Sequence, residues 1–208
     1  MDRRDKKFVV GNWKMNHNLE QIKNFISEVV EQSCHQWVAP QSIHLNQLKS
    51  LSANKDFLKS GSQNHSEHDS GAFTGENSLT SLKELGIHFT IVGHSERRQI
   101  FKENHQILSK KLIKSIELDI TSIFCIGETL EQREENLTND VLKEQLIEGL
   151  SLVKKEHLNK LIIAYEPVWA IGTGKTATAE TAQQAHSFVR KTLVEKFGND
   201  ANDIPILY

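Results

Sequence analysis

The chain has 208 residues, of which 38% are hydrophobic and 25% charged, a composition typical of a globular protein with one α/β domain of moderate size. Its formal net charge of −2 argues against the basic surface of proteins that bind nucleic acid or anionic membranes. We expect no signal peptide and no membrane span, and because two cysteines are too few for a disulfide framework, we expect a cytoplasmic protein without nucleic-acid or membrane partners.

Apolar segments that predict strands alternate with helical patterns along the chain. In chain order we expect a strand at 8–14, a helix at 18–32, a strand at 36–40, a helix at 42–51, strands at 57–64 and 89–94, a helix at about 104–118, a strand at 120–128, a helix at 139–153, a strand at 161–167, a helix at 180–197 and a strand at 204–208. This alternation predicts a single domain over residues 1–208, built on a parallel sheet with crossover helices.

Polar side chains follow five of the seven expected strands, at the point where each strand ends. The carboxyl ends of parallel strands meet at one edge of a sheet or barrel, and that edge carries the site in such folds. The residues concerned are Asn12 and Lys14, Gln63 and Asn64, His94, Glu128 and Glu166.

Lys14 and Asn12 lie two residues apart, so on a strand their side chains would share one face. A lysine cation beside an amide donor suits an anionic, oxygen-rich ligand. The alternative for a lysine at a strand end is a solvated surface charge.

His94 and Glu166 each end an apolar strand. Ser95 and Glu96 open a short helical turn after His94, and a helix N-terminus disfavours a positive imidazole, so we expect His94 to be neutral. Partial burial would raise the pKa of Glu166 toward the range of a general base. The alternatives are a histidine satisfied in the core and a carboxylate that caps a helix or pairs with an arginine. Glu96, Arg97 and Arg98 fit a supporting set of ion pairs, with surface placement as the alternative for either arginine.

The stretch "PVWAIGTGKT" after Glu166 is rich in glycine and has two readings. A nucleotide-binding loop would need a glycine five residues before Gly174, and Trp169 occupies that position. The other reading is a lid in which Gly172 and Gly174 expose backbone N–H groups to a phosphate, with the base at its root.

The polar segment 65–78 is long for a loop between a strand and a helix. His65, His68 and Asp69 suggest a metal site, but they lack a further pair at the spacing of known ligands, so we expect no metal. A functional or interfacial loop is the better interpretation.

The motifs "GNWKMN", "GAFTGE", "VGHSERR", "CIGE" and "YEPVWAIGTGKTAT" occur in the order found in the triosephosphate isomerases, and the chain resembles that family over its whole length. The resemblance implies a (β/α)8 barrel that interconverts dihydroxyacetone phosphate and glyceraldehyde 3-phosphate, a step of glycolysis and gluconeogenesis. It implies that Glu166 is the base, that His94 is the neutral electrophile, and that Lys14 attracts the substrate and stabilises enediolate charge.

The resemblance implies no cofactor and no metal. The remaining roles that it implies are a substrate hydrogen bond from Asn12, a phosphate contact from the N–H of Gly172, support of the site by Ser95 and Glu96, packing of Cys125 behind the base, and, in a homodimer joined through residues 65–78, insertion of Thr74 beside the partner's site.

The family's pattern continues where this sequence ends, with an eighth strand and two further helices, and such barrels typically have about 250 residues. We therefore expect an incomplete barrel of seven strands, and little isomerase activity from residues 1–208 alone. The alternative function is a non-catalytic fragment that acts as an oligomeric or interaction module.

Overall fold

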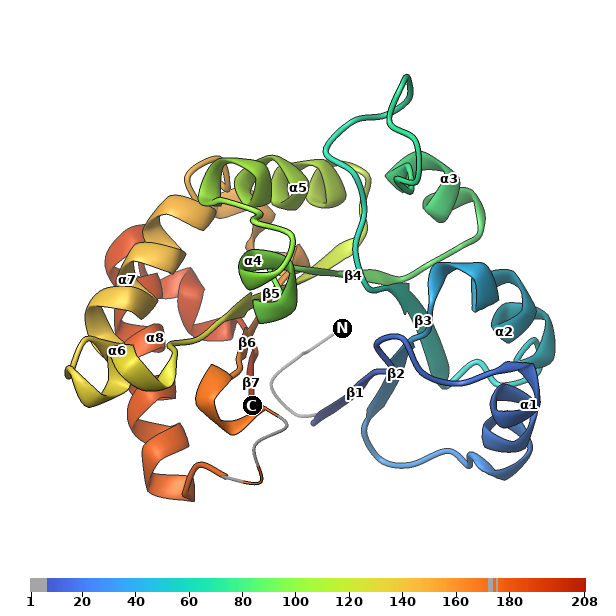
Figure 1. Ribbon diagram of the computed structural model, residues 1–208, viewed down its shortest axis with the longest axis horizontal. Helices are drawn as coiled ribbons and strands as arrows, with labels where there is room; N and C mark the ends of the chain where they lie inside the picture. The colour runs from blue at the N-terminus through green and yellow to red at the C-terminus, as the bar shows by residue number, and fades with distance from the viewer. Residues whose placement is uncertain (1–6, 172–173, 175) are drawn as a thin grey trace.

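The computed structural model describes residues 7–171, 174 and 176–208. Seven parallel strands pair in the order of the chain: β1 (Phe8–Asn12), β2 (His35–Ala39), β3 (Leu58–Ser62), β4 (Phe89–Val92), β5 (Thr121–Ile126), β6 (Leu161–Tyr165) and β7 (Ile206–Leu207). The sheet curls into a nearly closed barrel with the helices on its outside (Figure 1). The predicted α/β barrel with seven strands is confirmed.

Strands β4, β5 and β6 are largely apolar on both faces because both of their faces are covered. Every residue of β5 is buried. Ile123 and Cys125 pack with Phe89 inside the barrel, whereas Phe124 and Ile126 pack against the surrounding helices. A buried parallel sheet therefore shows continuous apolar runs in place of alternation.

The helices lie between successive strands and differ in detail from the prediction. They are α1 (Leu19–Glu28), α2 (Leu45–Leu51), α3 (Leu79–Glu84), α4 (Ser95–Gln99), α5 (His105–Glu117), α6 (Leu130–Glu134), α7 (Thr138–Gly149) and α8 (Ala179–Phe197), with short 3-10 helices at Ser42–His44, Lys155–Lys160, Val168–Ala170 and Asn199–Asp203. The first helix ends four residues earlier than expected, so Val30 leaves the apolar face and is 62% exposed. None of the helices of the described residues is long and apolar enough to cross a membrane.

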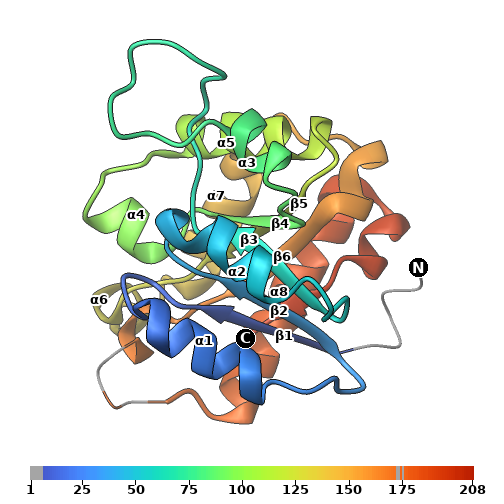
Figure 2. The same ribbon diagram turned by 90° about the vertical axis from the view of Figure 1, so that its right-hand side faces the viewer.

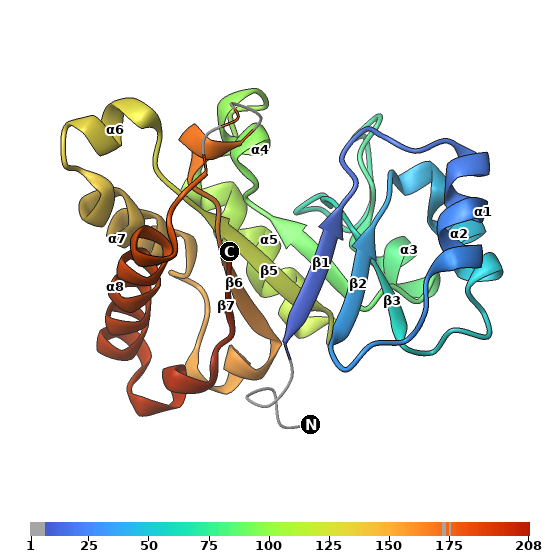
Figure 3. The ribbon, with the colours of Figure 1, turned by 90° about the horizontal axis from the view of Figure 1, so that it is seen from below.

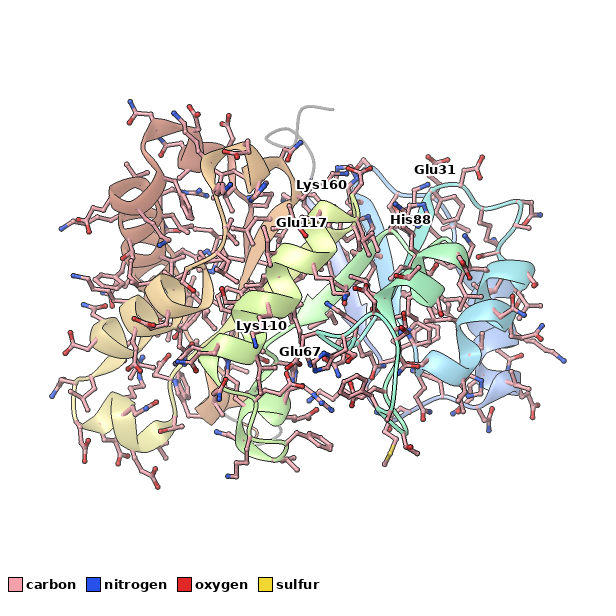
Figure 4. All side chains as sticks on the ribbon, turned by 90° about the horizontal axis from the view of Figure 1, so that it is seen from above. Glu31, Glu67, His88, Lys110, Glu117 and Lys160 are labelled. Atoms are coloured by element: carbon pink, nitrogen blue, oxygen red, sulfur yellow. The ribbon has the colours of Figure 1, made fainter. Side chains whose placement is uncertain are left out.

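The two ends of the barrel are distinct. Figure 4 shows α5 across the outside of the sheet, with Glu117 toward the edge that holds His88 and Lys160 and with Lys110 toward the edge near Glu67. His88 and Lys160 directly precede β4 and β6, whereas Glu67 follows β3. The first edge is therefore the one at which strands begin, and the second is the one at which they end.

Strands β1 and β7 are the two edges of the sheet, and among the described residues no backbone pairing joins them. Figure 3 looks at this side of the barrel, with β1 and β7 toward the viewer and no helix over them. Phe8 and Val10 pack into the interior, so Val9 faces outward, where it is 61% exposed.

The loop of residues 65–78 projects from the barrel beyond its helices (Figure 2). Its base is anchored, because His65 and Ser66 are buried and the N–H of Ser66 donates to the carbonyl of Asn77 at 2.9 Å. Its tip, including Thr74, is exposed. This confirms a long protruding loop.

Candidate active site

A cavity of about 290 Å3 opens at the end of the barrel where the strands finish. Its floor is apolar and its polar side chains come from strand ends far apart in the sequence. The lining residues include Asn12, Lys14, His94, Cys125 and Glu166. The structure thus brings together the principal residues that the sequence predicted for a site.

Asn12 ends β1, and Lys14 lies beyond it in a turn with left-handed backbone (φ 51°). The N–H of Lys14 donates to Asn12 Oδ1 at 3.1 Å, and Lys14 Nζ pairs with Glu96 Oε1 at 2.8 Å. The expectation that strand alternation places both side chains on one face was wrong, since the strand has ended before Lys14. The turn brings the ammonium group to the same cavity by another route.

His94 is the N-cap residue of α4, and its ring is nearly buried. The N–H of Glu96 donates to His94 Nδ1 at 3.2 Å, so Nδ1 is unprotonated and the ring hydrogen resides on Nε2. Burial, the largest cause, and the charge of Lys14 lower the pKa of His94, while Glu96 raises it. The ring is therefore a neutral imidazole, as the sequence predicted.

Glu166 follows β6 with its carboxylate held from two sides. Its Oε1 accepts from the N–H of Ser95 at 2.6 Å, and its Oε2 lies 3.1 Å from His94 Nε2. Burial raises the pKa of Glu166 to about 7, although the Ser95 N–H and the charges of Arg98 and Lys14 oppose the rise. The pKa is thus close to that of an effective base at neutral pH.

The backbone of Glu166 is fixed against β5. Its N–H donates to the carbonyl of Ile126 at 2.8 Å. At Gly127, a Cβ atom would overlap the carbonyl oxygen of Glu166, so only glycine fits there. Gly127, which follows β5, therefore allows the backbone at Glu166 to lie close against the end of β5.

The other predicted site residues differ in whether they line the cavity. Ser95 is buried below the carboxylate of Glu166, and Cys125 is buried in β5 on the cavity wall. Thr74 lies in the exposed tip of loop 65–78 and does not line the cavity. Gly172 lies outside the described residues.

The three residues weighed as metal ligands do not converge. His65 is buried and bonds to Thr90 Oγ1 and the carbonyl of Lys111, whereas His68 stacks on Phe73. Asp69 pairs with a lysine of α5. In the described part of the chain, no group of three or more His, Cys, Asp or Glu side chains is arranged to hold a metal ion.

The cavity thus combines a neutral histidine, a carboxylate of raised pKa and a lysine at one end of a barrel. Comparison of the whole sequence with known proteins points to one family. A model of the triosephosphate isomerase family matches residues 7–208. The triosephosphate isomerase of Emericella nidulans is 46% identical over 198 residues, which cover 93% of this chain and 79% of that protein. Those of Clostridium novyi and Chloroherpeton thalassium are 42% and 40% identical, and the matches cover 94% and 98% of this chain and 80% and 83% of those proteins.

The chain belongs to the triosephosphate isomerase family. Its function as a triose-phosphate isomerase follows from this membership and from the relatives of that name. The comparisons give no support to a non-catalytic module.

In this triosephosphate isomerase chain, Glu128 is a buried hydrogen-bond acceptor. The sequence analysis placed it at a strand end but assigned it no role. Its carboxylate accepts hydrogen bonds from Tyr165 Oη at 3.1 Å, from Trp169 Nε1 at 2.9 Å and from Arg133 Nη1 at 3.2 Å. Trp169 belongs to the expected lid, so Glu128 fixes the start of that segment to the barrel. The signal in the sequence was a carboxylate two residues after the buried strand β5.

Gln63 is a second supporting residue that the sequence placed only at a strand end. Its side-chain N–H group donates to the carbonyls of Lys14 and Ala39, both at 2.8 Å. It therefore fixes the left-handed turn that carries Lys14. Backbone contacts of this kind leave no pattern in the sequence.

Proposed function

We propose that this enzyme interconverts dihydroxyacetone phosphate and D-glyceraldehyde 3-phosphate through an enediolate, with Glu166 as the base. The observation that carries the proposal is that Glu166 Oε2 lies 3.1 Å from His94 Nε2, in a ring whose Nδ1 accepts from the N–H of Glu96. Burial, which raises the pKa of Glu166 to about 7, supports it. Base and electrophile thus stand in one cavity, in the protonation states that proton transfer next to a carbonyl requires.

In the mechanism that follows, Glu166 removes a proton from the carbon beside the carbonyl and returns it to the neighbouring carbon. The Nε2–H of His94 donates to the carbonyl oxygen as negative charge develops there, and a proton passes from the neighbouring hydroxyl oxygen to that oxygen before the second carbon is protonated. Lys14 provides positive charge for the dianionic substrate and the enediolate, and Asn12 provides a hydrogen bond. The N–H of Gly172, outside the described residues, is the proposed phosphate donor. Substrate and product are isomers, so no redox cofactor is needed.

The test is an assay of glyceraldehyde 3-phosphate isomerisation as a function of pH. We expect kcat/KM to fall as the pH drops below about 7, because the carboxylate of Glu166 becomes protonated and protonated carboxyl groups do not act as bases. A chelator should leave the rate unchanged. Loss of activity on chelation, with recovery on addition of Zn2+, would contradict this proposal.

The substitution His94→Gln tests the electrophile. We expect kcat to fall by about 100-fold or more and KM to change only a few-fold, since donors to a developing oxyanion act mainly in the transition state. Steady-state kinetics in both directions measure the split. A rise in KM with unchanged kcat would assign His94 to simple substrate binding.

The protein is further proposed to act in the cytoplasm as a homodimer joined through residues 65–78. The tip of this loop is exposed and carries Phe73, which is 41% exposed. A groove of about 450 Å3 lies beside the cavity, lined by Met15, Glu96, Ile100, Phe101 and others. Met15, Ile100 and Phe101 are large, apolar and exposed in the single chain. Exposed apolar side chains that lie together are typical of a surface that a partner covers.

Deleting residues 69–75 is expected to give monomers with lower activity, because the loop would no longer fill the partner's groove and steady the turn at Lys14. Sedimentation velocity measures the change. The control is Leu152→Ser, which removes a side chain that is 48% exposed and lines no part of that groove. A dimer that persists without the loop tip would refute the proposed interface.

A further inference from the structure

Arg98 of α4 joins the ends of β4 and β5. Its Nε donates to the carbonyl of Gly93 at 2.8 Å, and its Nη2 donates to the carbonyl of Cys125 at 2.9 Å. The guanidinium carbon lies 5.4 Å from the ring centroid of Phe124. A Cβ atom at Gly93 would lie 3.0 Å from Nη2, so the group is tightly enclosed.

The neighbouring Arg97 behaves differently. Its Nη2 pairs with Glu103 Oε1 at 2.6 Å, as expected for a supporting ion pair. The same expectation was wrong for Arg98, which forms no ion pair with a carboxylate within the described residues. Its hydrogen bonds go to neutral carbonyl oxygens, so its charge is not cancelled by direct contact.

We propose that Arg98 is a positioning residue for the isomerisation, which fixes the backbone before His94 and keeps a positive charge that acts on the carboxylate of Glu166. The inference rests on the proposed role of Glu166 as the base. Gly93 directly precedes His94, and the N–H of Ser95, two residues along, binds Glu166. A shift of the Gly93 carbonyl would therefore move both groups that contact the carboxylate.

The charge of Arg98 acts on the same carboxylate. Burial lowers the pKa of Arg98, and Cys125, Glu166 and Glu103 raise it again, which places the guanidinium within electrostatic reach of the base. The groups that act on Glu166 from the surrounding elements are Lys14 after β1, His94, the Ser95 N–H, Glu96 and Arg98 after β4, and the neutral thiol of Cys125 in β5. The charge of Arg98 lowers the pKa of Glu166 and so opposes the rise that burial causes. Without Arg98, the pKa of Glu166 would therefore be higher.

The experiment compares the pH dependence of kcat/KM in Arg98→Met and Arg98→Lys with that of the unaltered enzyme. In Arg98→Met we expect the acid limb to move up by about one pH unit, as for loss of one nearby opposite charge, and kcat at its plateau to fall by about tenfold or more. Arg98→Lys keeps the charge but lacks the planar fork that reaches two carbonyls. Its limb should stay near that of the unaltered enzyme while its plateau kcat falls. The substrate phosphate also titrates near pH 6, identically in every variant.

Arg190→Met is the matched control. Arg190 of α8 also donates to two backbone carbonyls, those of Ala201 and Ile204, at the end of the barrel where β7 begins. Its removal should lower the midpoint of thermal unfolding without moving the acid limb. An unmoved limb in Arg98→Met, or equal loss of kcat in the two Met variants, would overturn the inference. Absence of any limb near pH 7 in the unaltered enzyme would instead overturn the proposed role of Glu166.

Discussion

Glu166→Asp is expected to lower kcat by about a hundredfold, with KM within a few-fold of its original value. The substitution withdraws the carboxylate by one methylene from the N–H of Ser95 and from His94 Nε2, which lie 2.6 and 3.1 Å from it. A misplacement of about an ångström between base and substrate costs on the order of 100-fold in rate. Steady-state kinetics in both directions provide the measurement.

The same substitution at Glu144, an exposed carboxylate on α7, serves as the control. Glu144→Asp should leave kcat and KM unchanged, because this side chain lies outside the cavity. Near-normal turnover in Glu166→Asp would remove Glu166 from the role of base.

Gly127→Ala is expected to damage both stability and turnover. The new methyl group would overlap the carbonyl oxygen of Glu166, whose backbone is tied to Ile126 by a 2.8 Å hydrogen bond. Forcing an extra carbon into a packed site typically costs about 1–3 kcal/mol of unfolding free energy, and the chain that carries the base must also shift. We expect a loss near the top of that range and a fall in kcat of roughly 100-fold.

Denaturant unfolding and steady-state kinetics test Gly127→Ala against Gly198→Ala. Gly198 caps α8 with φ 80°, and a Cβ atom there would meet nothing within 4 Å. Its φ of 80° with ψ −168° is a conformation that is almost confined to glycine, so its substitution should cost backbone strain alone, about 1–3 kcal/mol, with kcat intact. Unchanged kcat in Gly127→Ala would show that the approach of the two chains does not position the base.

The elements with long patterns were the ones that could be predicted from sequence. The helix expected at 139–153 corresponds to α7, which buries Leu142 and Leu146, and the strand expected at 120–128 corresponds to the buried β5. Helix α3 was missed because its six residues bury only Leu79 and Leu82, which is too little for a period to emerge. Residues 42–44 were expected to be α-helical but form a 3-10 turn, a difference that periodicity does not resolve.

The position of the candidate site was predictable for a simple reason: polar residues that end apolar strands must gather at one edge of a parallel sheet. The supporting contacts were not predictable in the same way. Arg98 and Gln63 bind backbone carbonyls, and any residue has a carbonyl, so neither partner is marked in the sequence. Lys14 lines the cavity as expected, but it does so from a left-handed turn. The strand alternation that was used to predict its position does not apply there.

The hydrogen bond from the N–H of Glu96 to His94 Nδ1 makes the two nitrogens of this ring spectroscopically different. In a protein labelled with 15N-histidine, Nδ1 should resonate as a pyridine-type nitrogen and Nε2 as a pyrrole-type nitrogen, without averaging between the two. Protonation of the ring would require Nδ1 to give up its contact with the first turn of α4, so the pair of signals would report on ring charge and on helix geometry at once. The 15N signals of His94 would thus report on the site with the label in the protein and none on the substrate.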